Sequence, residues 1–236
     1  GEIRFSWKDG AIYLNDTRLR KGEEELIING AITGEGLDLV VTANGLSLSA
    51  LEIPVQDLEP AGFLKLDAKI NGTFASPVIS GKVEAEELAV AGFFLEKAAG
   101  EVRWQEEILS IKNMKVLRGS QELQASGEID FKNGPVAALE LWLERAEMAE
   151  LLRILGFSPA VAVTGEVTGT CRLLGPLESP AVTATVRLEK GRLGDLPVTG
   201  EADLEIKDST VILNRLFLTE SGGEGQLAVT AFYRPS

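Results

Sequence analysis

Apolar and polar residues alternate along most of this chain with a period of two. The stretch LKLDAKI at 64–70 alternates leucine, alanine or isoleucine with lysine and aspartate, as expected for a half-buried β-strand. ALELWLE at 138–144 and VTATVRL at 182–188 repeat this alternation. Because Gly, Asp, Asn or Pro bounds such stretches, we predict on the order of sixteen short strands.

One segment departs from the period of two. RAEMAELLRIL spaces Met148, Leu151 and Leu155 at helical intervals, is rich in helix formers and is followed by Gly156. This pattern predicts one short helix. A weaker helical pattern, LSALEI, lies near Ser49.

The chain repeats a frame of glycine, linker, Ser-Pro and strand. Gly72 and Pro77 recur as Gly175 and Pro180, each 103 positions later. Glycine can adopt a positive φ where a strand ends abruptly, and proline fixes φ at the start of the next strand. We therefore interpret these residues as structural residues that end one strand and begin the next, and not as catalytic residues.

A second set of motifs fixes the length of the repeat. GEIRFSW, GEVRWQE and GEADLEI begin at Gly1, Gly100 and Gly200, with spacings of 99 and 100 residues. We predict one elongated repeat segment over residues 1–236, divided into a partial repeat 1–99, a repeat 100–199 and a partial repeat 200–236. Such repeats stack so that neighbouring units bury a continuous apolar face. Because GEIRFSW begins within a strand pattern, we also expect the chain to be a piece of a longer protein.

Composition and charge narrow the function. Hydrophobic residues make up 44% of the chain, enough for a core, and no apolar run reaches the roughly 18 residues of a membrane span. The chain has 36 acidic and 23 basic residues and a formal net charge of −13. A nucleic-acid backbone would be repelled, so nucleic acid is not an expected partner.

The absence of histidine excludes much of enzyme chemistry. Without histidine, Ser-His-Asp and Cys-His arrangements cannot form, so Ser76 and Ser179 have no base to activate them. The single Cys171 provides neither a disulfide nor a thiolate cluster for zinc, and its position predicts a small buried thiol. The many carboxylates fit a solvated face better than an acid/base pair. We expect no enzymatic activity, no cofactor and no metal.

The order and spacing of these strand and glycine motifs resemble those of the TamB family of the AsmA-like superfamily. This resemblance is carried by the Gly-x-x-x-Ser-Pro phrase entering ISGKVEAEELAV, then GEVRWQEEILSIKNMKVLRGSQELQASGEIDF, a Leu-rich helix and VTGEVTGTCRLLGPLESP. The resemblance spans essentially the whole chain but includes no catalytic signature. It implies an elongated, partly rolled β-sheet with an apolar trough, within an inner-membrane-anchored protein that crosses the periplasm of diderm bacteria. It further implies conduction of phospholipids towards the outer membrane and cooperation with an outer-membrane barrel partner.

The strand count independently favours a curled sheet. About sixteen strands at roughly 4.8 Å spacing would extend about 75 Å, and twisted sheets of more than about ten strands do not stay open and flat. A sheet that curls without closing leaves an apolar groove, in which acyl chains are held by the hydrophobic effect. The candidate groove residues are Leu64, Leu66, Ala68, Ile70, Val83, Leu123, Ile129, Leu139, Leu141, Leu143, Val163, Val167, Val182, Val186, Leu204, Ile206, Leu227 and Val229.

Other interpretations of the pattern stay open. Each candidate groove residue could instead belong to a dry, packed core. The chain could be a β-rich scaffold whose edges pair with client strands, or, least favoured, a β-solenoid enzyme that acts on polysaccharide. Trp142 is expected to point away from Leu141 and Leu143, whereas the alternation does not settle the faces of Trp7 and Trp104.

Overall fold

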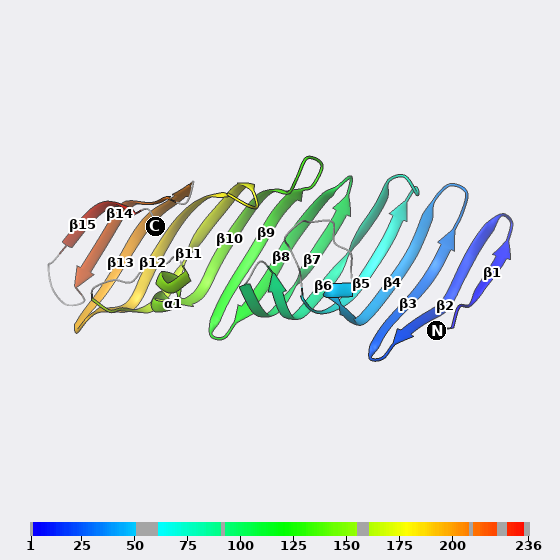
Figure 1. The fold of residues 1–236 in the computed structure, drawn as a ribbon, viewed down its shortest axis with the longest axis horizontal. Helices are drawn as coiled ribbons and strands as arrows, with labels where there is room; N and C mark the ends of the chain where they lie inside the picture. Colours follow the sequence, from blue (N-terminus) through cyan, green and yellow to red (C-terminus); the bar gives the residue numbers. More distant parts are fainter. Residues whose placement is uncertain are drawn as a thin grey trace. The chain divides into compact units, whose positions relative to one another are not determined.

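The computed structural model describes residues 2–50, 61–90, 93–154, 161–207, 210–220 and 226–233. The described chain consists of β-strands with one short α-helix and one short 3-10 helix (Figure 1). It divides into two compact units, Gly1–Arg118 with Asp130–Asn133 and Gly119–Ile129 with Gly134–Ser236. Each unit is described by itself.

The first unit is an antiparallel sheet in which every strand pairs with the next strand of the chain. Its elements are β1 (Phe5–Lys8), β2 (Ala11–Lys21), β3 (Glu24–Ile32), β4 (Leu37–Ser47), the 3-10 helix η1 (Leu48–Ala50), β5 (Ala61–Gly72), β6 (Pro77–Val90), β7 (Phe93–Gln105) and β8 (Ile108–Arg118).

The second unit follows the same scheme, with antiparallel pairs from β10 to β15. Its elements are β9 (Gln121–Asp130), β10 (Val136–Glu147), the helix α1 (Met148–Ile154), β11 (Val163–Pro176), β12 (Ala181–Leu193), β13 (Leu196–Lys207), β14 (Thr210–Glu220) and β15 (Gln226–Tyr233). Strand order follows chain order in each unit, and among the described strands the first and last do not pair to close the sheet. The predicted fold class, an open all-β sheet with short helical segments, is confirmed.

The sequence repeat corresponds to six strands. The GEVRWQE and GEADLEI motifs lie on β7 and β13, six strands apart. Gly72, the last residue of β5, has a φ of 98°, and Gly175, near the end of β11, has a φ of 105°. Pro77 begins β6, and Pro180 immediately precedes β12. The predicted positive φ of both glycines is therefore confirmed, whereas the repeat boundaries stay a prediction.

β-bulges also recur with the repeat, which the alternation did not reveal. The register shifts place an extra residue near Asp16 on β2 and at Asn113 on β8, and both have φ values near 50°. Glu87 on β6 and Lys190 on β12, 103 positions apart, are a second such pair, with φ of 54° and 49°. Bulges bend a strand and increase its twist. They give the sheet local curvature at repeated positions.

The short helix packs against a small buried cluster of the second unit. Val167, Leu188 and Val198 form a buried cluster, and Met148 and Leu151 of α1 pack against it. The predicted helix is thus confirmed, whereas Leu155 and its predicted end at Gly156 lie outside the described residues. At the weaker helical pattern, η1 forms one short turn that includes the buried Leu48.

Candidate functional site: an apolar sheet face

One face of the first unit is built from rows of apolar residues that cross the strands. Residues directly opposite each other on paired strands share a face. One row runs Leu14, Gly30, Leu39, Ile70, Ile79, Trp104 and Leu109; the next runs Thr17, Ile28, Val41, Ala68, Gly81, Val102 and Ile111; a third runs Leu19, Leu26, Ala43, Leu66, Val83 and Gly100. None of these rows contains a charged side chain.

The second unit repeats this arrangement on its own sheet. Its rows run Leu139, Leu173, Val182 and Ile206; Leu141, Cys171, Ala184 and Leu204; Leu143, Gly169, Val186 and Ala202; and Ala146, Val167, Leu188 and Gly200. These rows also lack charge. We call the two sets of rows the apolar face of each unit.

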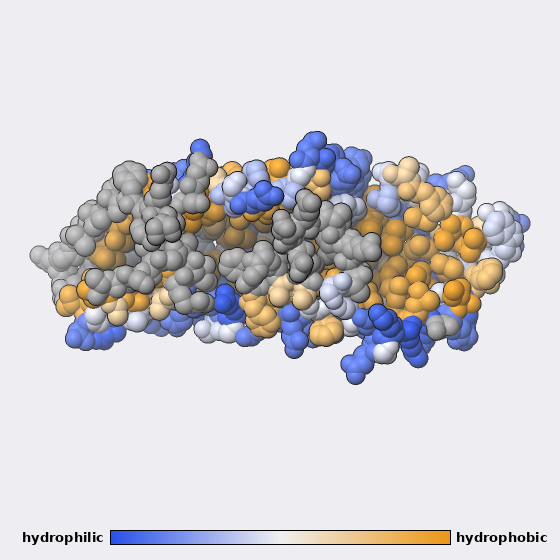
Figure 2. Space-filling model, in the orientation of Figure 1, coloured by the Kyte–Doolittle hydropathy of each residue, from blue (hydrophilic) through white to orange (hydrophobic). Residues whose placement is uncertain are grey.

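Most side chains of the apolar faces are only partly buried. Leu64, Leu66 and Ile70 are half-buried, as are Leu141 and Leu204. Among the described residues, Val167 is the one large side chain that is fully buried. Figure 2 shows hydrophobic residues gathered on the near face of β2–β4, with hydrophilic residues along the strand ends. The described part of each apolar face thus combines a few buried residues with a larger number of partly buried ones.

The predicted groove residues separate into the two units. Leu64, Leu66, Ala68, Ile70 and Val83 share the apolar face of the first unit. The rows of the second unit bring together Leu139, Leu141, Leu143, Val167, Val182, Val186, Leu204 and Ile206, while Val163 packs near α1 against the buried cluster.

The remaining predicted residues lie on β9 and β15. Leu123 and Ile129 are half-buried on β9. Leu227 and Val229 lie on β15, where their backbones pair with Leu218 and Leu216 of β14. The side chains at 227 and 229 are outside the described part of the structure. The role of all these residues in holding lipid stays a prediction.

The tryptophans occupy different faces. Trp142 lies in the polar row of Thr170, Thr185 and Asp203, so the prediction that it points away from Leu141 is confirmed. Trp7 lies opposite Ile12, at the exposed edge of the apolar face. Trp104 is in an apolar row, with its ring centroid 5.5 Å from that of Phe131.

The opposite face of each unit is polar, and several of its charged side chains form ion pairs. On β5–β7, Lys97 Nζ lies 2.8 Å from Glu84 Oε1, and Lys65 Nζ lies 3.2 Å from Glu86 Oε1. The hydrogen bond from Lys97 is the main cause that lowers the pKa of Glu84, and the hydrogen bond to Glu86 is the main cause that raises the pKa of Lys65. These exposed charged side chains make this face polar, in contrast to the uncharged rows of the apolar face.

The apolar faces offer little polar chemistry. Thr17, the one buried polar residue in the described part of the chain, donates its hydroxyl hydrogen to the Arg4 carbonyl oxygen at 2.9 Å. Burial raises the pKa of the Cys171 thiol, so the reactive thiolate is disfavoured. Across the described residues, no group of acidic or cysteine side chains could hold a metal ion, and no buried side-chain polar atom lacks a hydrogen-bond partner.

Comparison with known proteins finds no matching family model, no matching curated protein and no matching solved structure. Within the described ranges, no helix has the length and apolar character needed to cross a bilayer.

Proposed function

We propose that the apolar faces bind the acyl chains of phospholipids and that the chain is a segment of a bridge-like conduit between two membranes. The observation that carries this proposal is the set of uncharged rows in both units, most of whose side chains are only partly buried. A surface of this kind is costly to leave in water unless something apolar covers it. Acyl chains meet that need without specific polar contacts.

The energetics of the apolar face would allow an acyl chain to be retained and also to move sideways from row to row. Each CH₂ group removed from water contributes about 0.8 kcal/mol. Adjacent rows present similar aliphatic side chains, so a chain that slides from one row to the next exchanges like contacts for like. From β2 to β8 the strands span about 29 Å at roughly 4.8 Å spacing, whereas one leaflet of a bilayer core is about 15 Å thick. The apolar face of the first unit therefore has room for an extended acyl chain.

The resemblance to the TamB family extends the proposal to a cellular setting. The chain would be a periplasmic segment of an inner-membrane-anchored envelope protein, would carry phospholipid between the inner and outer membranes, and would support outer-membrane biogenesis with a barrel-type partner. It would need no enzymatic step, cofactor or metal.

Lipid extraction and native mass spectrometry of the purified protein test the proposal. We expect co-purifying phospholipid, or loading from vesicles, in the wild type. Leu66→Asp places a charge on the apolar face of the first unit and should reduce loading, whereas Tyr13→Asp adds the same charge on the polar face, where Tyr13 is 40% exposed, and should not. Failure of a folded wild-type sample to take up phospholipid would overturn the proposal.

A second candidate function rests on the edge strand β1. Ile3, Phe5 and Trp7 are each about two-thirds exposed, at 66%, 64% and 68%, and β1 pairs on one side with β2. Apolar side chains on an outermost strand favour pairing with a further strand, either of the same protein or of a client. A β-rich scaffold that assists assembly of outer-membrane or secreted proteins would use this edge. Crosslinking of client strands to residue 7 in a lipid-free sample would favour this function over transport.

A further inference from the structure

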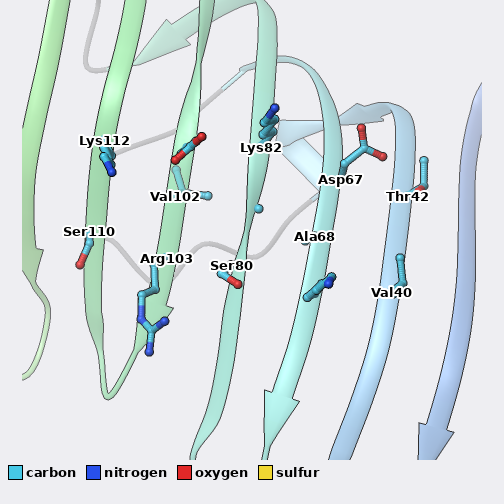
Figure 3. A pocket seen from close by; sticks show the side chains of 13 residues that line it. Val40, Thr42, Asp67, Ala68, Ser80, Lys82, Val102, Arg103, Ser110 and Lys112 are labelled. Atoms are coloured by element: carbon cyan, nitrogen blue, oxygen red, sulfur yellow. The ribbon is translucent and has the colours of Figure 1, made fainter.

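The polar face of the first unit contains a shallow depression across β4–β8. Its volume is about 600 Å³, and strand backbone at Ala68 and Gly81 contributes to its lining. Figure 3 shows Ser80, Arg103 and Ser110 in one cross-strand row, with Lys82 and Lys112 two residues further along their strands. Ala68, Gly81 and Val102 of an apolar row also line the depression, but they alternate along the strands with Lys69, Ser80 and Arg103, whose side chains point away from the surface proposed to hold acyl chains.

Cations outnumber carboxylates in this depression. Lys69, Lys82, Arg103 and Lys112 line it, together with the carboxylates of Asp67 and Glu101. The chain as a whole has a net charge of −13. The depression therefore has more positive than negative side chains, although the protein as a whole is acidic. The average composition of the chain does not explain this local excess of positive charge.

The lysines of the depression are not neutralised by ion pairs. Asp67 and Glu101 lie directly opposite Lys82 on the neighbouring strands, yet within the described part of the chain neither they nor Lys69, Lys82 or Lys112 form an ion pair or hydrogen bond through their side chains.

Several other cations on the polar faces form ion pairs. Arg187 lies 2.6 Å from Glu201, and Arg172 lies 2.7 Å from Glu140. Lys65 and Lys97 share Glu84 and Glu86 in the same way. Those ion pairs connect side chains on neighbouring strands, whereas the lysine N–H donors of the depression form no hydrogen bond in the described part of the chain.

The strand register places these donors around one point. Lys69, Ser80 and Arg103 lie opposite one another on β5, β6 and β7, so the two cations flank the Ser80 hydroxyl at roughly 4.8 Å per strand. Lys82 follows on the same face of β6. Arg103 donates from Nη2 to Gln105 Oε1 at 2.6 Å, which leaves its other N–H groups available. A tetrahedral oxyanion above Ser80 would thus lie between two cations and beside a hydroxyl, with Lys82 further along β6, and these are the donor types that recognise phosphate.

We propose that this depression binds a phosphate-type oxyanion. The two flanking carboxylates limit the positive area to one phosphoryl group, and the net negative charge opposes a polyanion such as nucleic acid. The same chemistry could come from a soluble phosphate or phosphomonoester or from the phosphate of a lipid headgroup in a membrane surface. The proposal does not depend on acyl-chain binding by the apolar face.

Titration with inorganic phosphate and with glycerol phosphate, followed by calorimetry or by ³¹P line broadening, tests the site. We expect saturable binding that weakens as salt rises, because exposed charges are screened beyond about 8 Å at physiological ionic strength. Arg103→Gln should weaken binding roughly tenfold, as loss of one charge-assisted contact predicts. Arg172→Gln removes an exposed arginine from the polar face of the second unit and should leave the affinity unchanged.

Vesicles distinguish the source of the anion. Flotation with vesicles of phosphatidic acid in phosphatidylcholine, with phosphatidylcholine alone as control, is compared for wild type, Arg103→Gln and Leu66→Asp. Vesicle binding that Arg103→Gln abolishes and Leu66→Asp retains assigns the site to lipid headgroups. Binding of glycerol phosphate without vesicle binding assigns it to a soluble anion. Absence of both, or equal effects of Arg103→Gln and Arg172→Gln, would overturn the proposal.

Discussion

Ala68 on β5 and Gly81 on β6 lie directly opposite each other in an apolar row, where the two strands approach very closely. A Cβ atom at position 81 would lie 2.6 Å from the Cα of Ala68 and would also collide with the carbonyl oxygen of Asp67. Glycine at this position is therefore required by strand packing. The same pair shows how small residues in the apolar rows keep the face continuous without adding bulk.

Gly81→Ala should destabilise the protein by about 1–3 kcal/mol, the usual cost of overpacking a close contact. The free energy of unfolding from urea titration is the measurement. Gly34→Ala is the matched control, because a Cβ at position 34 meets nothing within 4 Å. Equal stability of the two variants would contradict the close approach.

The ion pairs on β5–β7 predict a dependence of stability on pH. The pKa of Glu84 is lowered in the folded protein, first by the hydrogen bond from Lys97. Its contribution is therefore present above the pKa of the unfolded chain and is lost as pH falls through the folded value. We expect urea midpoints to fall between pH 6 and acid more steeply for the wild type than for Glu84→Gln. Parallel pH profiles would show that the pair contributes nothing.

The bulge at Asn113 predicts an unusual pattern of tolerated substitutions. Its φ of 51° is left-handed, a conformation that costs a β-branched residue roughly 1–2 kcal/mol. Asn113→Val should therefore lower the free energy of unfolding by about that amount, while Asn113→Gly should be tolerated. Asn71→Val, at an exposed strand position without positive φ, controls for the loss of the amide. A stable Asn113→Val protein would contradict the left-handed bulge.

Cys171 is a natural probe of the apolar face of the second unit. Because burial raises its pKa, less thiolate is present at neutral pH. Its reaction with a disulfide reagent should be severalfold slower in the folded than in the urea-unfolded protein, and slower still after loading with phospholipid. In a Cys171→Ala background, Thr170→Cys places a thiol on the exposed polar face, where loading should have no effect. Unchanged Cys171 reactivity on loading would argue against acyl chains at this part of the face.

The alternation of residues determined much of this protein. Period two at 64–70 and 182–188 gave the strands and their faces, because side chains on a strand point alternately to opposite sides. The helical spacing of Met148 and Leu151 gave α1, and the repeated Gly72 and Gly175 gave the strand ends that need positive φ. All of these depend on local geometry, which a short stretch of sequence contains.

The tertiary structure decided what depends on register. Apolar rows across β2–β8 form only because each hairpin sets which residues of adjacent strands lie opposite one another, and a bulge such as that at Asn113 changes this count by one. The same pairing places Lys69, Ser80 and Arg103 side by side although 34 residues separate the first from the last. No local pattern marks those three residues as a group, because their proximity arises from the register of hydrogen bonds between successive strands, which no short stretch of sequence specifies.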